Sequence, residues 1–215
     1  FLVDWYWVAG RTRHMHYLDA LRQARFREHL QWAVLWANHN PPKTHSEEDW
    51  RNVVRFWIDT YFADPQYLRI GGSPAVFIWA PHSIRADVGG SAAAARLAEI
   101  AQEMTRAAGL PGLTLVAMRR TAEEDLRSEG YAAVTSYHWW SDSLQRAPNP
   151  RYLPYSMVVE RSRSGWDAAE RHLQAAGLGF IPVVDTGWDA RPRHGSRTVR
   201  SEERRVGKEC RSRWS

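Results

Sequence analysis

Aromatic side chains next to carboxylate, amide or imidazole groups recur at five points of the chain, each at or near the end of a short apolar run. The five segments are VDWYW (3–7), VLWAN (34–38), VFIWAPH (76–82), VTSYHWW (134–140) and VVDTGWD (183–189). Sugar rings present flat apolar C–H faces, so carbohydrate sites combine exposed aromatic rings with polar groups that bind hydroxyls. The recurrence therefore predicts a sugar-binding cleft built from several strand ends.

The candidate residues of this cleft are aromatic rings that could stack on a sugar and polar groups that could bind its hydroxyls. A single buried tryptophan usually packs in a core, and Trp50 and Trp57, which are spaced as on a helix, are expected to do so. The argument rests on the set as a whole, because core packing alone does not require aromatic residues to gather at strand ends. The candidates are Trp7, Trp36, Trp79, Tyr137, Trp139, Trp140 and Trp188, beside Asp4, Asn38, His82, His138, Asp185 and Asp189.

Cleavage of a glycosidic bond usually needs two carboxylic acids in a fixed relation. Asp4, Asp185 and Asp189 lie at or near predicted strand ends, whereas no glutamate does. Asp4 fits a structural role equally well. Most glutamates fall in first helical turns, where they complement the helix dipole. The residues alone therefore define no catalytic pair.

Histidines offer a competing hypothesis, a metal-dependent hydrolase on a similar fold. The ligands would come from His14, His16, His39, His45 and His138. In such enzymes the paired histidines emerge directly from a strand, whereas His14 and His16 lie several residues beyond the first apolar run. We therefore expect no metal and no cofactor.

Charge and cysteine content narrow the class of protein further. The net charge is +5, but residues 190–215 hold nine of the 29 Lys and Arg and three of the 24 Asp and Glu, which leaves 20 basic and 21 acidic residues over 1–189. A neutral body argues against nucleic acid as a partner. Cys210 is the one cysteine and lies near the C-terminus. No apolar run is long enough to span a membrane, and the compartment stays open.

The order of elements predicts an α/β fold with a parallel sheet. Six strands are separated by helices over about 189 residues, and no glycine-rich phosphate loop follows the first strand. The order fits six units of an incomplete (β/α)8 barrel. Expected strands are 1–8, 31–37, 75–80, 113–118, 132–137 and 179–185, and expected helices are 14–29, one capped by Ser46, 92–108, 121–129 and 166–176.

Four motifs together resemble the WbsX-type proteins of bacterial polysaccharide loci, which are related to glycoside hydrolase family 99. They are VDWYW, LWANHN, YLRIGGSPAVFIW and GWDARPR, in the same order. The resemblance implies a (β/α)8 barrel that acts on glycans, with relatives that are retaining endo-acting mannosidases. It also assigns substrate contacts to Asp4, Tyr6, Trp7, Trp36, Asn38, Trp188 and Asp189.

The same resemblance implies that the catalytic acids are missing from this chain. The family carries its carboxylate pair in a later Asn-Glu-Trp motif, and this chain contains no such sequence. We therefore expect residues 1–195 to be an inactive part of the barrel, truncated at both ends, and 196–215 to be a disordered, vector-like tail. The parent protein is expected to process an oligo- or polysaccharide as a glycosidase. The alternative is a non-hydrolytic role, glycan binding or glycosyl transfer in polysaccharide assembly.

Overall fold

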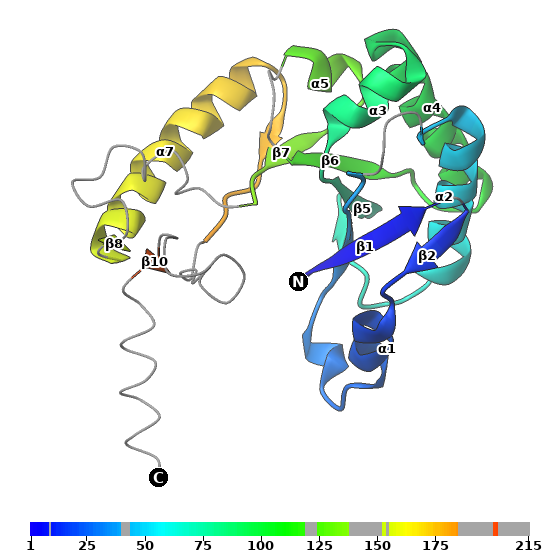
Figure 1. Cartoon of the computed structure of the whole chain (residues 1–215), viewed down its shortest axis with the longest axis horizontal. Coiled ribbons are helices and arrows are strands. Elements are labelled where there is room, and N and C mark those ends of the chain that lie inside the picture. The colour runs from blue at the N-terminus through cyan, green and yellow to red at the C-terminus, as the bar shows by residue number, and fades with distance from the viewer. Residues whose placement is uncertain are drawn as a thin grey trace. The chain divides into compact units, whose positions relative to one another are not determined.

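The structure is a computed structural model of the chain (Figure 1), and its residues form two compact units. Unit 1 comprises Phe1–Thr135 and Ala175–Gly179, and unit 2 comprises Ser136–Gln174 and Phe180–Ser215. The residues that the structure describes are 1–8, 10–39, 44–118, 124–137, 152–153, 155–184 and 200–201.

Unit 1 is built on one mostly parallel sheet. Its strands are β1 (Leu2–Val8), β2 (Arg11–Arg13), β3 (Ala33–Trp36), β4 (Arg69–Ile70), β5 (Ser73–Ile78), β6 (Thr114–Met118), β7 (Ala133–Thr135) and the first residue of β9 (Gly179–Phe180). They lie in the order β2-β1-β3-β5-β6-β7-β9, and β4 pairs with β5. Four successive pairings, from β1–β3 to β6–β7, are parallel. β2 and β4 form antiparallel hairpins with β1 and β5.

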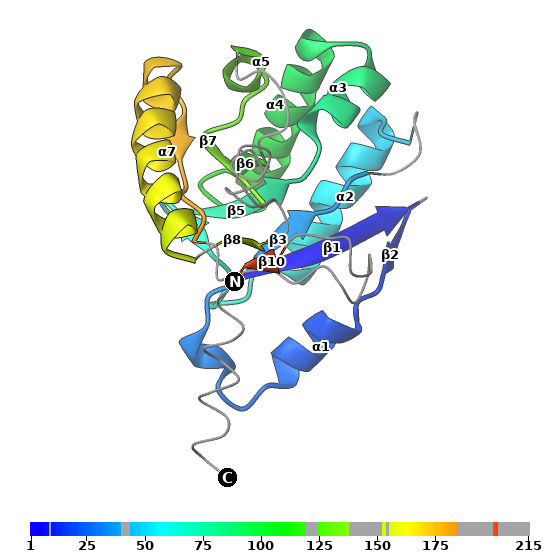
Figure 2. The same cartoon turned by 60° about the vertical axis from the view of Figure 1, so that its left-hand side comes forward.

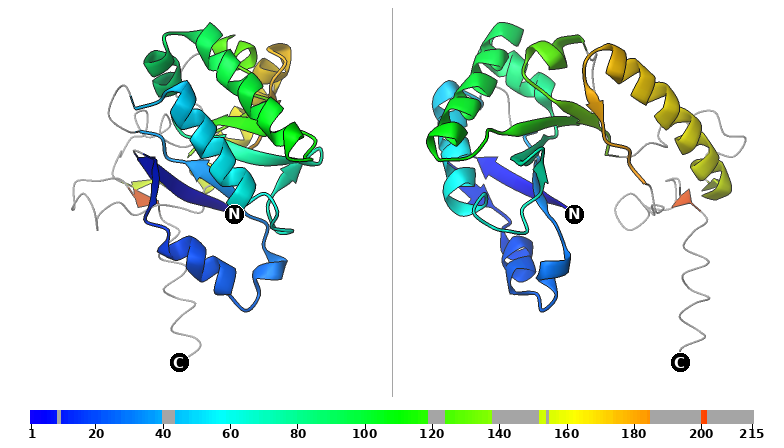
Figure 3. Two further views of the ribbon diagram at one scale, coloured as in Figure 1. Left: turned by 90° about the vertical axis from the view of Figure 1, so that its right-hand side faces the viewer. Right: turned by 180° about the vertical axis from the view of Figure 1, so that it is seen from behind.

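Helices connect the parallel strands, as the predicted order of elements requires. They are α1 (His16–Gln23), α2 (Glu47–Thr60), α3 (Pro81–Val88), α4 (Ser91–Ala107) and α5 (Glu124–Ser128), with a short 3-10 turn at Arg27–His29. α2 and α4 pack side by side against the sheet (Figure 3, left). α1 lies apart from them, next to the β1–β2 hairpin (Figures 1 and 2).

A layer of aromatic rings fills the space between the sheet and α2. Trp5, Trp36 and Trp57 are at most 1% exposed, and the Trp57 ring centroid lies 5.4 Å from that of Trp5 and 5.8 Å from that of Trp36. The Trp5 indole Nε1–H donates to the Tyr61 hydroxyl over 3.0 Å. Trp50 is 4% exposed. The prediction that Trp50 and Trp57 pack in the core is confirmed, and their burial supplies much of the hydrophobic stabilisation of this layer.

Two amide side chains extend the pairing of strands beyond the main chain. Asn38 Nδ2 donates to the Ala80 carbonyl over 2.9 Å, and the Ala80 N–H donates to Asn38 Oδ1 over 2.7 Å. Gln102, on α4, makes the equivalent pair with Leu113: its Nε2 donates to the Leu113 carbonyl over 2.6 Å and its Oε1 accepts the Leu113 N–H over 3.0 Å. The first clamp lies just beyond the ends of β3 and β5, and the second just before β6.

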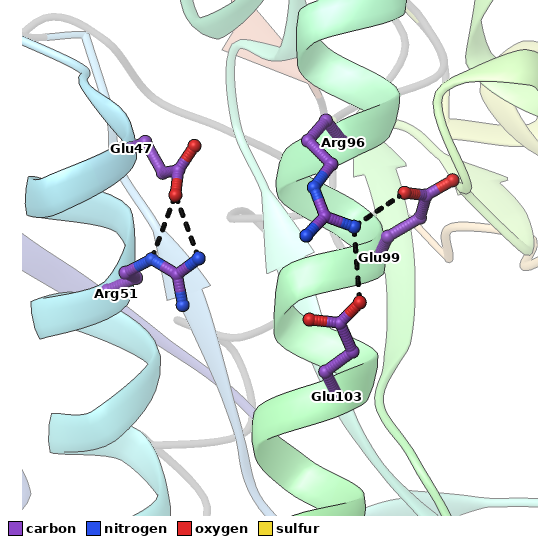
Figure 4. Close-up of polar contacts among 5 residues, drawn as sticks. All are labelled: Glu47, Arg51, Arg96, Glu99 and Glu103. Carbon is purple, nitrogen blue, oxygen red and sulfur yellow. Dashed lines mark hydrogen bonds and ion pairs between the residues drawn. The ribbon is translucent and has the colours of Figure 1, made fainter.

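The exposed sides of α2 and α4 carry ion pairs (Figure 4). Arg51 Nε and Nη2 donate to Glu47 Oε1 over 3.0 and 2.8 Å. Arg96 Nη1 donates to Glu99 over 2.9 Å and to Glu103 over 3.1 Å. Such solvated pairs add little stability. They do mark these helix faces as facing water.

Several predicted elements are confirmed with shifted bounds. Ser46 caps α2, because its Oγ accepts the Asp49 N–H over 3.1 Å, and Gly71 and Gly72, both with positive φ, make the turn of the β4–β5 hairpin. The predicted first helix, 14–29, is shorter: α1 ends at Gln23, and Ala24 has an extended backbone. α3 was not predicted, and it begins with proline at its first turn, a favoured place for that residue.

Unit 2 contains nearly all of one long helix, α7 (Tyr155–Ala175), and a short parallel pair of strands, β8 (Tyr152–Leu153) and β10 (Arg200–Ser201). α7 begins eleven residues before the predicted start at Trp166. The predicted domain boundary near residue 195 lies outside the described residues and stays a prediction. In the described part of the chain, no helix has the length and apolar character needed to cross a membrane.

Candidate functional site

Alternation along β1 separates two groups of side chains. Val3, Trp5 and Trp7 are buried, whereas Asp4 is exposed and Tyr6 is half-buried. Successive side chains of a strand point to opposite faces of the sheet. Because Trp5 packs on α2, Asp4 and Tyr6 lie on the face opposite α2, which we call the inner face.

The register carries this assignment across the sheet. Asp4 is level with Leu35 of β3, and Leu35 is level with Phe77 of β5. Two residues further along, at the carboxyl ends of the strands, the same alternation places Tyr6 and Trp79 on the inner face. The carboxyl ends of parallel strands are where α/β folds bind ligands.

Ring contacts join the residues at this edge into a cluster. The Tyr6 ring centroid lies 5.6 Å from that of His14 and 6.2 Å from that of His39, both nearly perpendicular to it. His39 continues to Trp79, with centroids 6.4 Å apart. Asp4 and Tyr17 adjoin the same group. His39 interacts electrostatically with the Asp4 carboxyl group, and Asp4 and Tyr6 interact electrostatically with the Tyr17 hydroxyl. We call Asp4, Tyr6, His14, Tyr17, His39 and Trp79 the inner-face cluster.

Backbone conformation and the Asn38 amide position three of the rings. His14 has φ of 57° and is the one non-glycine residue with positive φ in the described ranges. This left-handed conformation is unfavourable for most side chains, although histidine adopts it more readily than bulky residues do. His39 follows Asn38 and Trp79 precedes Ala80, so the amide clamp between Asn38 and Ala80 fixes the relative position of the two rings.

The cluster also shifts the ionisation of two members. Partial burial raises the pKa of the Asp4 carboxyl group, and the nearby His39 opposes that rise. Burial, with the Asp4 carboxylate and Tyr6 adding to it, raises the pKa of Tyr17 from 10.0 to about 12. An accessible carboxylate beside flat rings can accept hydrogen bonds from sugar hydroxyls while the rings contact the sugar's C–H face.

Three residues predicted as sugar contacts lie outside the inner-face cluster. Trp7 is 5% exposed and donates from Nε1 to Asp49 on α2 over 2.9 Å. Trp36 is 1% exposed and packs between the sheet and α2. Asn38 is fully buried, and its amide is engaged by Ala80. The side chains of Trp7, Trp36 and Asn38 are therefore not available to a sugar, and Asn38 acts on the cluster by positioning its neighbours.

The remaining candidates have other positions. Tyr137 belongs to unit 2 and is 46% exposed, and His82 lies within α3, where it is partly buried. The other predicted contacts, His138, Trp139, Trp140, Asp185, Trp188 and Asp189, lie outside the described residues. Their roles stay predictions.

Among the described histidines, His45 lies apart from His14 and His39, and His16 contacts Tyr17. His14 and His39 belong to the inner-face cluster, whereas His45 is buried in the α2 layer with its Nδ1 2.6 Å from Asp87 Oδ2. Within the described ranges, no three His, Cys, Asp or Glu side chains lie close enough together to hold a metal ion.

Sequence reasoning missed His14, Tyr17 and His39 as members of an aromatic site. His14 and His39 were considered only as metal ligands, and Tyr17 lies in the first turn of α1 and not on a strand. All three follow a predicted strand end in the sequence, near Tyr6 or Asn38. They were not identified because only the apolar runs themselves were searched for aromatic site residues.

Comparisons with known proteins agree with this fold. The sequence matches the family described as "Glycosyltransferase WbsX" over residues 1–206. No curated protein matches it. Three solved structures resemble it, and the first is a "Glycoside hydrolase-like protein" with a TM-score of 0.60 and 15% identity, where the match covers 94% of this chain and 63% of that one. The second is the GH99 endo-α-mannosidase from Bacteroides thetaiotaomicron, with a TM-score of 0.57, 17% identity and coverage of 92% of this chain and 53% of that one. The third is a GH99 endo-α-mannosidase of that organism in complex with bis-tris propane, with a TM-score of 0.52, 20% identity and coverage of 83% of this chain and 48% of that one.

These likenesses concern the fold. The chain spans between 48% and 63% of the length of the three structures. Its mostly parallel sheet, with helices between the strands, has the fold of an incomplete (β/α)8 barrel, which confirms the predicted fold class. Because the family match extends over residues 1–206 of 215, the chain belongs to the WbsX glycosyltransferase family.

Proposed function

We propose that the protein processes an oligo- or polysaccharide and that the inner-face cluster forms part of its sugar-binding surface. The observation that supports this most is the chain of rings from His14 through Tyr6 and His39 to Trp79, beside the exposed carboxylate of Asp4. It lies at the carboxyl ends of parallel strands, where barrel enzymes build their sites. The GH99 endo-α-mannosidase fold of the neighbours adds a glycan as the class of ligand.

We propose further that the whole protein is a retaining glycosidase and that this chain binds glycan without cleaving it. Retaining cleavage needs two carboxyl groups about 5–5.5 Å apart. In the described part of the inner face, Asp4 is the one acid of the cluster, and the chain has no Asn-Glu-Trp sequence. Non-hydrolytic glycosyl transfer is the second candidate, favoured by the description of the family.

Calorimetric titration of the 215-residue chain with α-manno-oligosaccharides and bacterial polysaccharide fragments tests binding. Tyr6→Ala and Trp79→Ala should each raise the Kd about fivefold, since one contact between an aromatic ring and the sugar contributes about 1 kcal/mol to the binding free energy. Phe26→Ala is the matched control, because Phe26 is 59% exposed and lies outside the cluster. Equal losses in all three variants, or no binding by the wild-type chain, would contradict the binding proposal.

Activity assays separate the two candidate reactions. The wild-type chain should release no reducing ends from a glycan that it binds, because the described part of the inner-face cluster offers one acid, Asp4. Hydrolysis that persists in purified protein would refute the proposal that this chain binds glycan without cleaving it. Transfer of a sugar from an activated donor, without hydrolysis, would support the second candidate.

A further inference from the structure

The β1–β2 hairpin places two arginines on the inner face. Arg13 is the cross-strand partner of Tyr6, and Arg11 is the partner of Val8. Residues directly opposite each other in an antiparallel pair point to the same face of the sheet, with Cβ atoms about 4.5–5.5 Å apart. Thr12, opposite Trp7, points the other way and is less exposed than its two neighbours.

Within the described residues, four other arginines of unit 1 are paired with acids, whereas Arg11 and Arg13 are not. Arg27, Arg51, Arg85 and Arg96 each form an ion pair with an acid. Arg11 and Arg13 are exposed, and neither forms an ion pair or hydrogen bond with another described side chain. Their guanidinium groups are therefore available to a ligand that occupies the inner face.

The balance of charge there is positive. Among described residues of the cluster and hairpin, Asp4 is the one acid, and Arg11 and Arg13 are the permanent cations; His14 and His39 flank Tyr6. Asp19, on α1, is exposed. The planar guanidinium binds carboxylate and phosphate through paired hydrogen bonds, so this edge suits an anionic group on a sugar that contacts the rings.

We propose that the inner-face site takes a negatively charged glycan, one that carries a uronic acid carboxylate or a phosphate, and that Arg13 and Arg11 bind the anionic group. The proposal rests on the proposed function, since it names the substrate class of the same site. Tyr6 and Trp79 contact the sugar ring, and the Asp4 carboxylate accepts a hydrogen bond from a sugar hydroxyl. The two arginines of the hairpin favour a ligand with negative charge. A neutral mannoside would leave both arginines unused.

Matched ligands test this directly. The wild-type chain is titrated with an oligouronide and with the same oligosaccharide after reduction of its carboxyl groups, and with a phosphorylated oligomannoside before and after phosphatase treatment. We expect the charged member of at least one pair to bind more tightly, with an affinity that falls as salt rises. The pair that discriminates more strongly identifies carboxylate or phosphate as the recognised group.

Variants assign the preference to the hairpin. Arg11→Gln and Arg13→Gln should each weaken binding of the charged ligand about fivefold, as for an exposed charge pair, and leave the neutral ligand unchanged. Arg55→Gln, an exposed arginine on α2, is the control of equal charge and should change neither. Equal binding of charged and neutral ligands, unaltered in the hairpin variants, would overturn the charge preference while leaving glycan binding intact. Failure of every glycan to bind would overturn both proposals.

Discussion

Replacement of Asn38 by alanine should destabilise unit 1 strongly, because it removes hydrogen bonds between two buried residues. Asn38 and Ala80 are 0% and 1% exposed, and the amide satisfies both the N–H and the carbonyl of Ala80. Asn38→Ala leaves two buried backbone groups without these partners. Each such group costs about 1–3 kcal/mol, so the free energy of unfolding should fall by about 4 kcal/mol, a large share of the 5–15 kcal/mol typical of a domain.

Urea unfolding followed by tryptophan fluorescence measures this loss. Asn52→Ala, on the exposed side of α2, removes the same amide and should change stability by less than about 0.5 kcal/mol. A loss in Asn38→Ala no larger than in this control would refute the reasoning. Glycan binding should weaken as well, because His39 and Trp79 lose their fixed separation.

Asn38→Asp provides a second test of the same contact. The introduced carboxylate still accepts the Ala80 N–H but faces the Ala80 carbonyl, to which it cannot donate. Burial raises the pKa of such a group above its unfolded value of about 3.9. Protonation restores a donor, so the stability gap to wild type should narrow as pH falls. A gap that stays constant down to acid pH would show that the donor is unimportant.

Three further predictions concern stability. Glu129→Gln should lower the free energy of unfolding by about 3 kcal/mol in urea titrations, because Glu129 is buried and its charge pairs with Arg85; a loss below about 1 kcal/mol would contradict a structural role for the pair. Ser46→Ala should cost about 1 kcal/mol and Ser46→Asp much less, since aspartate also caps helices; equal losses would exclude the cap. Burial raises the pKa of Tyr17 and Tyr61 from 10.0 to about 12. Their protons are held more tightly in the folded state, so their contribution to stability is full below pH 10 and is lost as pH rises through about 12. Tyr17→Phe should make the alkaline loss smaller, and an unchanged pH profile would count against the burial of that hydroxyl.

The sequence predicts the order of elements well because each depends on local signals. The Ser46 cap, the glycine pair at 71–72 and the apolar runs of the strands are all readable within a few residues. α3 was not predicted because it has eight residues and follows β5 closely, with no loop between them to indicate where a helix begins. The last helix was predicted to begin at Trp166, whereas α7 begins at Tyr155 and includes Gly165.

The site was harder to predict because it depends on which face each aromatic residue occupies. Tyr6 and Trp7 are neighbours in sequence, yet one joins the inner-face cluster and the other donates to Asp49 on α2. Trp5, Tyr6 and Trp7 are all aromatic, so the sequence of β1 shows no alternation of polar and apolar residues here from which to choose between them. The choice follows from the position of α2, which depends on contacts between residues about 50 positions apart, such as Trp5 with Trp57.

The two amide clamps explain how strands can end in this sheet without leaving peptide groups unpaired. A primary amide has the same donor and acceptor as a peptide bond, so Asn38 acts as one extra rung that a side chain adds to the ladder. The Trp79 N–H donates to the Trp36 carbonyl over 3.0 Å, so the Asn38 amide adds the next contact after the last main-chain hydrogen bond between these segments. The spacing from Trp36 to Asn38 therefore determines whether the amide meets Ala80.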